Sequence, residues 1–356
     1  IATTALLAGA IMVGAWYFGL LDKLPSVQMP DFVRNLPFVS QLDGGYANED
    51  DDTQAFPEPG DDPANVDGIE PTVTPIDVAR EDDSDTNESR ESAVGMDEIA
   101  VPVRGGLDEY SWDELKSIAE EIEGCTSSEA AMEVAKRYNL ADSSGKLSGK
   151  TKDVKLSDNK TMHMRVVGVW HDKADTTSGK AGLTFLSDGM VTRHQMHSDE
   201  TISGGWKSSG MRAWLSSDLW ESLAGDVSSA IIPIYKLTNN SGETRTVSSV
   251  TETIESLWLP SIVEVCGPVD WEYQSNPSNS DLYNSIFNAE GSQYLAFFQQ
   301  SIDCNASNKA LSLGDEWWMR STSAASGKGR CVSGDGDPSC YDLTNEEKGV
   351  VVGFCL

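Results

Sequence analysis

The sequence is poor in basic residues. Its 356 residues include 26 Lys and Arg against 57 Asp and Glu, which gives a formal net charge of −31. Such a surface repels phosphate backbones and anionic lipid headgroups, so we expect no nucleic acid partner. Six Cys are too few for a disulfide-dense miniprotein, whereas 39% hydrophobic residues and ten Trp are too many for a wholly disordered chain.

Catalytic and metal-binding motifs are also scarce. The chain has four His, no H-E-x-x-H, no paired C-x-x-C and no G-x-S-x-G elbow. His194 and His197 could bind zinc together with His171 or Asp199, although two His in a polar loop are usually plain surface residues. We therefore assign no catalytic residue and no zinc site.

Only one long hydrophobic run is present. Residues 1–20 carry no charge and would span roughly 30 Å as a helix, which is the thickness of a bilayer core. The run ends in three consecutive aromatic residues, Trp16 to Phe18, as is typical of a membrane interface. The hydrophobic region of a signal peptide is shorter, about 7–15 residues, and follows positive charge. We expect a single transmembrane helix over residues 1–20.

The next segment, residues 21–106, is acidic and rich in Pro. It holds nine of the 14 Pro, and residues 43–98 contain 19 acidic residues against two Arg. Such a composition offers too little apolar surface to offset the roughly 1–2 kcal/mol per residue that backbone ordering costs. We expect a disordered linker that holds the rest of the chain away from the membrane.

Two capping boxes indicate that folded structure begins after the linker. Ser111 with Glu114, and Thr126 with Glu129, each precede apolar residues at helical spacing. Residues 107–150 are therefore predicted to form a helical hairpin. Each helix has one apolar face, so we expect the hairpin to pack on the domain that follows or on a partner.

Residues 151–356 contain eight of the ten Trp and are predicted to form one α+β globular domain. Short apolar runs between turn residues predict strands, and a few amphipathic segments predict helices. Residues 154–167 are predicted to form a β-hairpin that turns at residues 157–159, and the other predicted strands include residues 181–186, 257–260, 317–320 and 350–354.

Cys331 and Cys340 enclose a short Gly- and Asp-rich loop, and their spacing favours a disulfide between them. Six Cys allow 15 connectivities, and buried thiols are the alternative. Asp335 and Asp337 in this loop offer oxygen ligands for calcium, although the EF-hand pattern is absent. Calcium is thus the one cofactor left open, and otherwise we expect none.

Consecutive side chains of a strand point to opposite faces, so Trp317 and Trp318 cannot both enter one core. The usual outcome is a second layer that covers the other side chain. An exposed aromatic ring beside Arg would instead suit sugar or peptide binding. On this basis Trp318, Arg320 and Arg330 are the candidate ligand-binding residues.

Five segments together carry a resemblance to a known family: Trp206 to Leu215, Leu237 to Asn240, Leu257 to Glu264, Trp317 to Ser321, and Gly349 to Phe354. In this order they resemble an uncharacterised domain of unknown function, abundant in surface proteins of gut Actinobacteria and Firmicutes, over about residues 150–356. The resemblance implies an exported domain, often on a single-pass anchor, and since the family has no established activity it gives no catalytic residue. The element order also resembles the C-type-lectin-like and sulfatase-modifying-factor folds. Cys266 and Cys355 lie in the family-like segments Val265 to Pro268 and Phe354 to Leu356, and these positions suggest a second disulfide.

These features together predict a bacterial surface protein, held in the cell membrane by residues 1–20 with its C-terminal domain extracytoplasmic. We expect this domain to be a binding module for adhesion or for glycan or peptide recognition, and not an enzyme. Two alternatives remain open. One is an envelope hydrolase whose carboxylates are assembled in space, and the other is a sensor stalk whose cytoplasmic part precedes Ile1.

Overall fold

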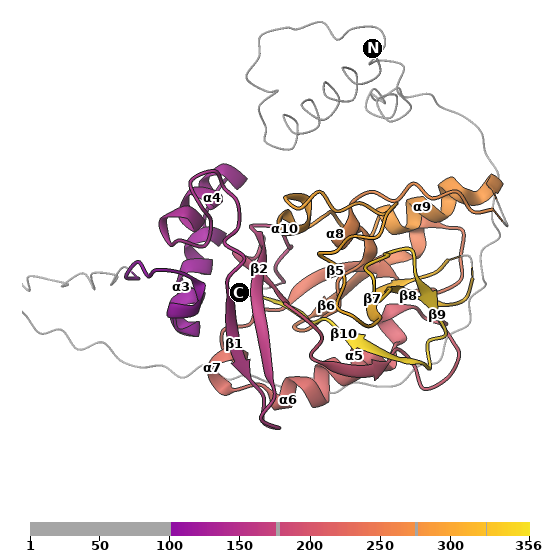
Figure 1. The fold of residues 1–356 in the computed structure, drawn as a ribbon, viewed down its shortest axis with the longest axis horizontal. Coiled ribbons are helices and arrows are strands. Elements are labelled where there is room, and N and C mark those ends of the chain that lie inside the picture. Colours follow the sequence, from indigo (N-terminus) through magenta and orange to yellow (C-terminus); the bar gives the residue numbers. More distant parts are fainter. Residues whose placement is uncertain (1–100, 176–178, 275–276, 325) are drawn as a thin grey trace, which may run out of the picture. The chain divides into compact units, whose positions relative to one another are not determined.

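The computed structural model describes residues 101–175, 179–274, 277–324 and 326–356 (Figure 1). The predicted transmembrane helix, residues 1–20, and the linker up to residue 100 lie outside these ranges. Within the described ranges, no helix is both long enough and apolar enough to cross a bilayer. The predicted helical hairpin and α+β domain fall within one compact unit, Ile99–Leu356.

Two sheets and one separate hairpin make up the β structure of this unit. The first sheet has the order β1-β2-β3-β11 and the second has the order β4-β10-β7-β8-β9, while β5 pairs only with β6. All neighbouring strands are antiparallel except β10 and β7, which are parallel. The strands are β1 (Thr151–Lys155), β2 (Thr161–Val169), β3 (Leu183–Ser187), β4 (Thr192–Gln195), β5 (Ile234–Asn239), β6 (Val250–Glu255), β7 (Trp317–Thr322), β8 (Gly329–Val332), β9 (Tyr341–Asp342), β10 (Glu347–Val350) and β11 (Gly353–Cys355).

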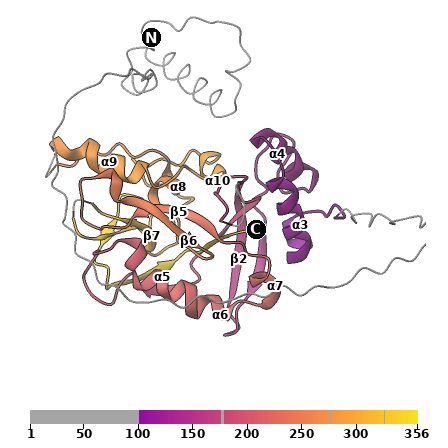
Figure 2. The ribbon, with the colours of Figure 1, turned by 180° about the vertical axis from the view of Figure 1, so that it is seen from behind.

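The helices are short and lie around the sheets. In both views α8, α9 and α10 lie on one side of the sheets, and α5, α6 and α7 on the opposite side (Figures 1 and 2). A π-helical turn, Leu215–Leu219, joins α5 to α6. The helices are α3 (Trp112–Glu123), α4 (Ser128–Arg137), α5 (Gly210–Trp214), α6 (Trp220–Ser222), α7 (Gly225–Ser228), α8 (Ile262–Cys266), α9 (Ser280–Asn288) and α10 (Leu295–Phe298), with 3-10 turns at Leu107–Glu109, Trp206–Ser208, Val247–Ser249 and Pro277–Asn279.

Two predicted strands differ from the structure. Residues 350–354 do not form one strand: β10 ends at Val350 in the second sheet, and β11 begins at Gly353 in the first. The chain thus crosses between the sheets. Residues 257–260 contribute only a single bridge, in which the backbone N–H groups and carbonyls of Trp258 and Gly353 exchange hydrogen bonds of 3.1 and 2.8 Å. A Cβ atom at Gly353 would lie 2.8 Å from the indole of Trp258, so this approach requires glycine.

The helical hairpin forms as its caps predict. The Ser111 hydroxyl accepts a hydrogen bond from the backbone N–H of Glu114, and the Glu114 carboxylate accepts one from that of Ser111. The second helix, α4, differs by one residue because its cap is Ser127 and not Thr126. The Ser127 hydroxyl accepts from the N–H of Ala130 at 3.2 Å.

The hairpin shares a hydrophobic core with the first sheet. The ring of Trp112 in α3 packs edge-on against Phe185 of β3 and Phe354 of β11, with 5.7 Å between centroids in each pair. Gly182 allows this contact, because a Cβ atom there would lie 2.1 Å from the carbonyl oxygen of Ala119. The hairpin is therefore part of the same folded unit as the sheets (Figure 1).

The substitution Trp112→Ala should lower the free energy of unfolding by about 3–5 kcal/mol, because it leaves a large cavity between α3 and the first sheet. Chemical denaturation of the detergent-solubilised full chain, followed by circular dichroism, measures this loss. Trp112→Phe is the matched control and should cost less, since it keeps an aromatic ring against Phe185. A loss below about 1 kcal/mol for Trp112→Ala would show that the hairpin does not stabilise the sheet.

Candidate functional site

The three residues predicted to bind a ligand are buried. Trp318 and Arg320 lie in β7 and are 0% exposed, and Arg330 lies in β8 and is 2% exposed. Every residue of β7 is buried, because other layers cover both faces of this strand. The expectation of an exposed aromatic face here is therefore wrong: the second face of the strand is covered, as is usual for a central strand.

Arg320 is fully engaged inside the protein. Its guanidinium forms a two-pronged ion pair with the carboxylate of Glu264, which lies in α8. It also donates to the hydroxyl of Thr238 at 2.8 Å and to the carbonyls of Leu259 and Glu290 at 2.9 and 3.1 Å. These donors link β7 to β5 and to the segments around α8 and α9, so Arg320 has a structural role.

Lys236, in β5, is a second buried cation beside Arg320. Its ammonium donates to Asp172 at 2.5 Å, to Glu264 at 2.9 Å and to the Tyr294 hydroxyl at 2.6 Å. It also lies 4.5 Å from the ring centre of Trp258. The two cations thus share the carboxylate of Glu264. The residues of this buried ion network are Asp172, Lys236, Glu264, Glu290, Tyr294 and Arg320.

The cations keep two of these carboxylates ionised. Burial alone would raise the pKa of Asp172, but the charge of Lys236 holds it below its usual range. Burial also acts to raise the pKa of Glu264, and the charges of Arg320 and Lys236 outweigh it. Two negative charges therefore balance two positive charges in the network.

Glu290 is the third carboxyl group of the network and has a different environment. It accepts a hydrogen bond from the backbone N–H of Asn239 at 3.0 Å and another from the hydroxyl of Ser321. Burial raises the pKa of Glu290 to about 7, against the lowering effect of the charge on Arg320. This group therefore carries a proton below neutral pH.

A thiol lies at the edge of the network but is not a nucleophile. Sγ of Cys355 is 3.6 Å from a carboxylate oxygen of Asp172 and 3.4 Å from the hydroxyl of Thr184. Burial, together with the charge of Asp172, raises the pKa of the Cys355 thiol well above its usual value. A thiol held protonated in a closed interior cannot attack a substrate, so we assign Cys355 no nucleophilic role.

The predicted zinc ligands do not gather. His194 stacks on Trp214 with 4.6 Å between ring centroids, whereas His171 packs against Tyr294 at 4.8 Å. His197 is buried, and burial lowers its pKa. In the part of the chain that the structure describes, no three His, Cys, Asp or Glu side chains are placed to hold a metal ion.

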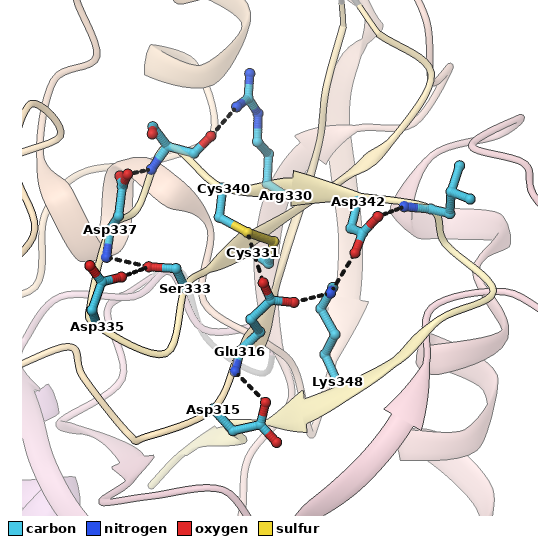
Figure 3. The surroundings of a disulfide bond; sticks show 12 residues. Asp315, Glu316, Arg330, Cys331, Ser333, Asp335, Asp337, Cys340, Asp342 and Lys348 are labelled. Atoms are coloured by element: carbon cyan, nitrogen blue, oxygen red, sulfur yellow. Dashed lines mark hydrogen bonds and ion pairs between the residues drawn. A yellow bond between two sulfur atoms is a disulfide. The ribbon is translucent and has the colours of Figure 1, made fainter.

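Cys331 and Cys340, the pair favoured by their spacing, are joined by a disulfide between β8 and β9, with their Cα atoms 5.0 Å apart (Figure 3). The second pair suggested by the resemblance is not formed. Cys266 and Cys355 are buried free thiols, because Cys266 ends α8 while Cys355 lies in β11 of the first sheet.

The acidic loop inside the disulfide folds back on itself (Figure 3). The Ser333 hydroxyl donates to the carboxylate of Asp335, and the Asp337 carboxylate accepts from the N–H of Ser339 at 2.8 Å. The N–H of Asp337 donates to the Ser333 hydroxyl at 2.8 Å. Both acidic side chains thus have an oxygen engaged in stabilising the turn.

Arg330 is enclosed by aromatic rings. Its guanidinium carbon lies 4.6 Å from the ring centre of Trp271, 5.0 Å from that of Phe287 and 5.2 Å from that of Tyr341. It donates to the Tyr273 hydroxyl at 3.2 Å, and within the described ranges no carboxylate lies within ion-pair distance. Burial lowers the pKa of Arg330. Arg330 therefore packs against Trp271 through a cation–π contact.

Trp271 also lines a groove beside α9. Its volume is about 430 Å³, which is within the size of small-ligand sites, about 300–1,000 Å³. Most of its lining is polar, and three of the lining residues are acidic. The lining residues are Val269, Asp270, Trp271, Glu272, Ser280, Asp281, Asn284, Ser285 and Asn288. We call this feature the α9 groove.

Two amides fix the walls of the α9 groove. Asn284 and Asn288 lie one turn apart on α9, and their side-chain NH2 groups donate to the carbonyls of Trp271 and Val269 at 2.8 and 3.0 Å. The side-chain oxygen of Asn288 also accepts from the N–H of Val269 at 2.7 Å. The segment around Trp271 is thus held against α9, and the groove is preformed.

The sequence patterns did not predict the α9 groove. Two signals could have indicated it: Trp271 stands between Asp270 and Glu272, and two Asn recur four residues apart on the following helix. Neither signal identifies a site alone, because the groove forms only where residues 269–272 meet α9.

The chain matches a family over its C-terminal half. A DUF6273 domain, a domain of unknown function, spans residues 181–356. The match includes β3 and β11 of the first sheet, while β1, β2 and the helical hairpin precede it. No curated protein and no solved structure matches the chain.

The substitution Lys236→Met should lower the free energy of unfolding by about 3–5 kcal/mol, because it leaves Asp172 buried without its closest cation. Thermal and chemical unfolding of the full chain measure the change. Lys173→Met is the matched control: Lys173 pairs with Glu252 at 2.8 Å on the surface, and its loss should cost at most about 1 kcal/mol. Equal losses for the two variants would contradict a stabilising role for the network.

The protonation of Glu290 should make stability fall as pH rises. Its pKa is about 7 in the folded chain against 4.5 as the ordinary value, so the folded state holds the extra proton between these two pH values. This group favours the fold fully below pH 4.5. Its contribution is lost as pH rises through 7, and the loss amounts to about 3 kcal/mol.

Glu290→Gln removes this titration and keeps hydrogen-bonding groups for Asn239 and Ser321. The difference between the free energies of unfolding of the variant and of the natural chain should therefore change by about 3 kcal/mol in favour of the variant from pH 5 to pH 8. Urea unfolding at each pH measures this difference. His197 titrates with the opposite sign but is common to both proteins, so its effect cancels. Parallel stability curves for the two proteins would contradict the assignment to Glu290.

Proposed function

We propose that this chain is a membrane-anchored surface protein of a bacterium whose extracytoplasmic domain binds glycans in the α9 groove. Residues 1–20 would be the single transmembrane helix, and the acidic linker would hold the domain away from the membrane. A C-type-lectin-like head is part of this proposal, supported by the order of its Trp-bearing helix, the Trp317-Trp318 strand and its closing strand.

The observation that carries the proposal is the chemistry of the α9 groove. Trp271 is half-buried and contacts Arg330, and carboxylates and amides line the same groove. Aromatic rings that contact C–H groups, next to polar groups that bind hydroxyls, are the combination that sugar recognition uses. The Asn284 and Asn288 contacts hold this surface in place, which lowers the entropy cost of binding.

The disulfide supports the proposed extracytoplasmic location of the domain. Disulfides persist in oxidising compartments and are rare in the cytosol. The Cys331–Cys340 bond therefore agrees with an extracytoplasmic domain. The uncharged run at residues 1–20 agrees with an anchor.

A second candidate is an envelope glycoside hydrolase. Asp270, Glu272 and Asp281 line the same groove, and paired carboxylates are the catalytic groups of such enzymes. This candidate predicts that a bound glycan is cleaved, with release of new reducing ends. A pure binding module leaves the glycan intact.

The full chain in a detergent without sugar groups should bind one or more glycans on an array, and Ser285→Trp should weaken this binding at least about tenfold by filling the groove. Ser216→Trp is the matched control. Both Ser are exposed on helical turns, and their hydroxyls donate to backbone carbonyls within the same turn, Asp281 O and Ala213 O. Failure of the folded natural chain to bind any glycan would contradict the proposal, as would equal binding by the two variants.

A further inference from the structure

We propose that the α9 groove selects saccharides with free amino groups, of the glucosamine type, over N-acetylated and acidic sugars. This inference rests on the proposed glycan-binding function and adds the chemical class of the ligand. It follows from the hydrogen-bonding groups that the groove leaves without a partner.

Most of the side chains that line the groove already use a hydrogen-bond donor within the protein, whereas the Ser280 hydroxyl accepts from the backbone N–H of Tyr273 and can still donate. The indole N–H of Trp271 donates to the carbonyl of Cys304 at 2.8 Å. The side-chain NH2 groups of Asn284 and Asn288 hold the opposite wall, and the hydroxyl of Ser285 donates to the carbonyl of Asp281 at 2.6 Å. A ligand that mainly accepts hydrogen bonds would find few donors here.

The acceptors, in contrast, remain available. In the part of the chain that the structure describes, the carboxylates of Glu272 and Asp281 are exposed and take no hydrogen bond or ion pair. Asp270 uses one carboxylate oxygen for the Asn305 amide, at 2.9 Å, and its other oxygen is unused. The groove is therefore rich in acceptors.

Asn284 gives an independent indication. It is only 7% exposed, it lines the groove, and its side-chain oxygen has no hydrogen-bond partner. Buried polar atoms are nearly always paired, so this oxygen would accept a hydrogen bond from any donor that reaches it past the atoms that now cover it. The expected ligand group is one that donates.

The negative charge of the groove narrows the chemical class of the expected ligand further. Three of its nine lining residues are acidic and none is basic. Arg330, which contacts the ring of Trp271 among other aromatic rings, does not line the groove. An ammonium group has three donors and no acceptor, and it carries the charge that these carboxylates attract. A uronic or sialic acid would be repelled.

A saccharide fits this lining better than a lysine side chain. Lys presents its three donors at the end of a long apolar stem, and only Val269 and Trp271 could cover such a stem. An amino sugar spreads several hydroxyl donors around its ammonium group, and the acceptors of the groove are spread in the same manner along both walls. A Lys-containing peptide is therefore the competing ligand in the test.

The test compares three probes of similar length with the full chain: a glucosamine tetramer, the same tetramer fully N-acetylated, and a tetralysine peptide. Isothermal titration calorimetry at low and at physiological salt gives the affinities. The glucosamine tetramer should bind at least about tenfold more tightly than its N-acetylated form, and added salt should reduce this difference. Acetylation keeps the sugar backbone, so the difference reports the ammonium group.

Variants distinguish binding in the groove from the general attraction of a cation to the negative charge of the chain. Asp281→Asn and Glu272→Gln should each weaken the glucosamine tetramer at least about fivefold. The N-acetylated tetramer should lose less. Glu200→Gln removes an exposed acid outside the groove and is the matched control, with unchanged affinity expected. Circular dichroism confirms that each variant is folded.

Each result decides one question. Equal binding of the two tetramers, or an unchanged affinity in both groove variants, would overturn the amino-sugar inference while the glycan-binding function stands. Tighter binding of tetralysine, lost in Asp281→Asn, would overturn it in favour of a basic peptide. Binding of neither tetramer, together with silence on the glycan array, would overturn the proposed function itself.

Discussion

Two buried cations, Arg320 and Lys236, share the carboxylate of Glu264, and the arrangement of the α+β domain depends on this contact. It ties a strand of the second sheet and a strand of the separate hairpin to one short helix, α8. Loss of one partner would leave a charge in the interior without compensation, so these elements must keep their relative positions. The two cations already balance the two carboxylates of Asp172 and Glu264. A third negative charge, on Glu290, would have no cation of its own, which agrees with the raised pKa of Glu290.

The ion network also positions the α9 groove. Glu264 lies in α8, and the chain that leaves α8 forms the wall around Trp271. Glu290 follows α9 directly, and its backbone carbonyl accepts a hydrogen bond from Arg320. Both walls of the groove thus begin or end at a member of the network. The closed interior and the acceptor-rich groove are therefore held by the same chain segments. The interior is structural, and the groove is a surface that a ligand can reach.

The sequence predicted some elements well, and the reason is local. The Ser111 cap and the apolar spacing of α3 act within a few residues, and so does the short loop between Cys331 and Cys340. The prediction for Trp318, Arg320 and Arg330 went wrong for a non-local reason. A strand pattern shows that two Trp face opposite ways, but whether a second layer covers the outer one depends on segments far away in the chain. Arg320 finds Glu264 across 56 residues.

The sequence by itself determined the class of the domain, the helix caps and the excess of negative charge, because these follow from composition and from contacts between near neighbours. Only the tertiary structure decided that residues 350–354 divide between two sheets and that Cys266 and Cys355 stay apart. It alone brought residues 269–272 against α9 to make a groove. Burial, ion pairing and the matching of donors with acceptors depend on which distant segments meet, and that is settled when the whole core packs.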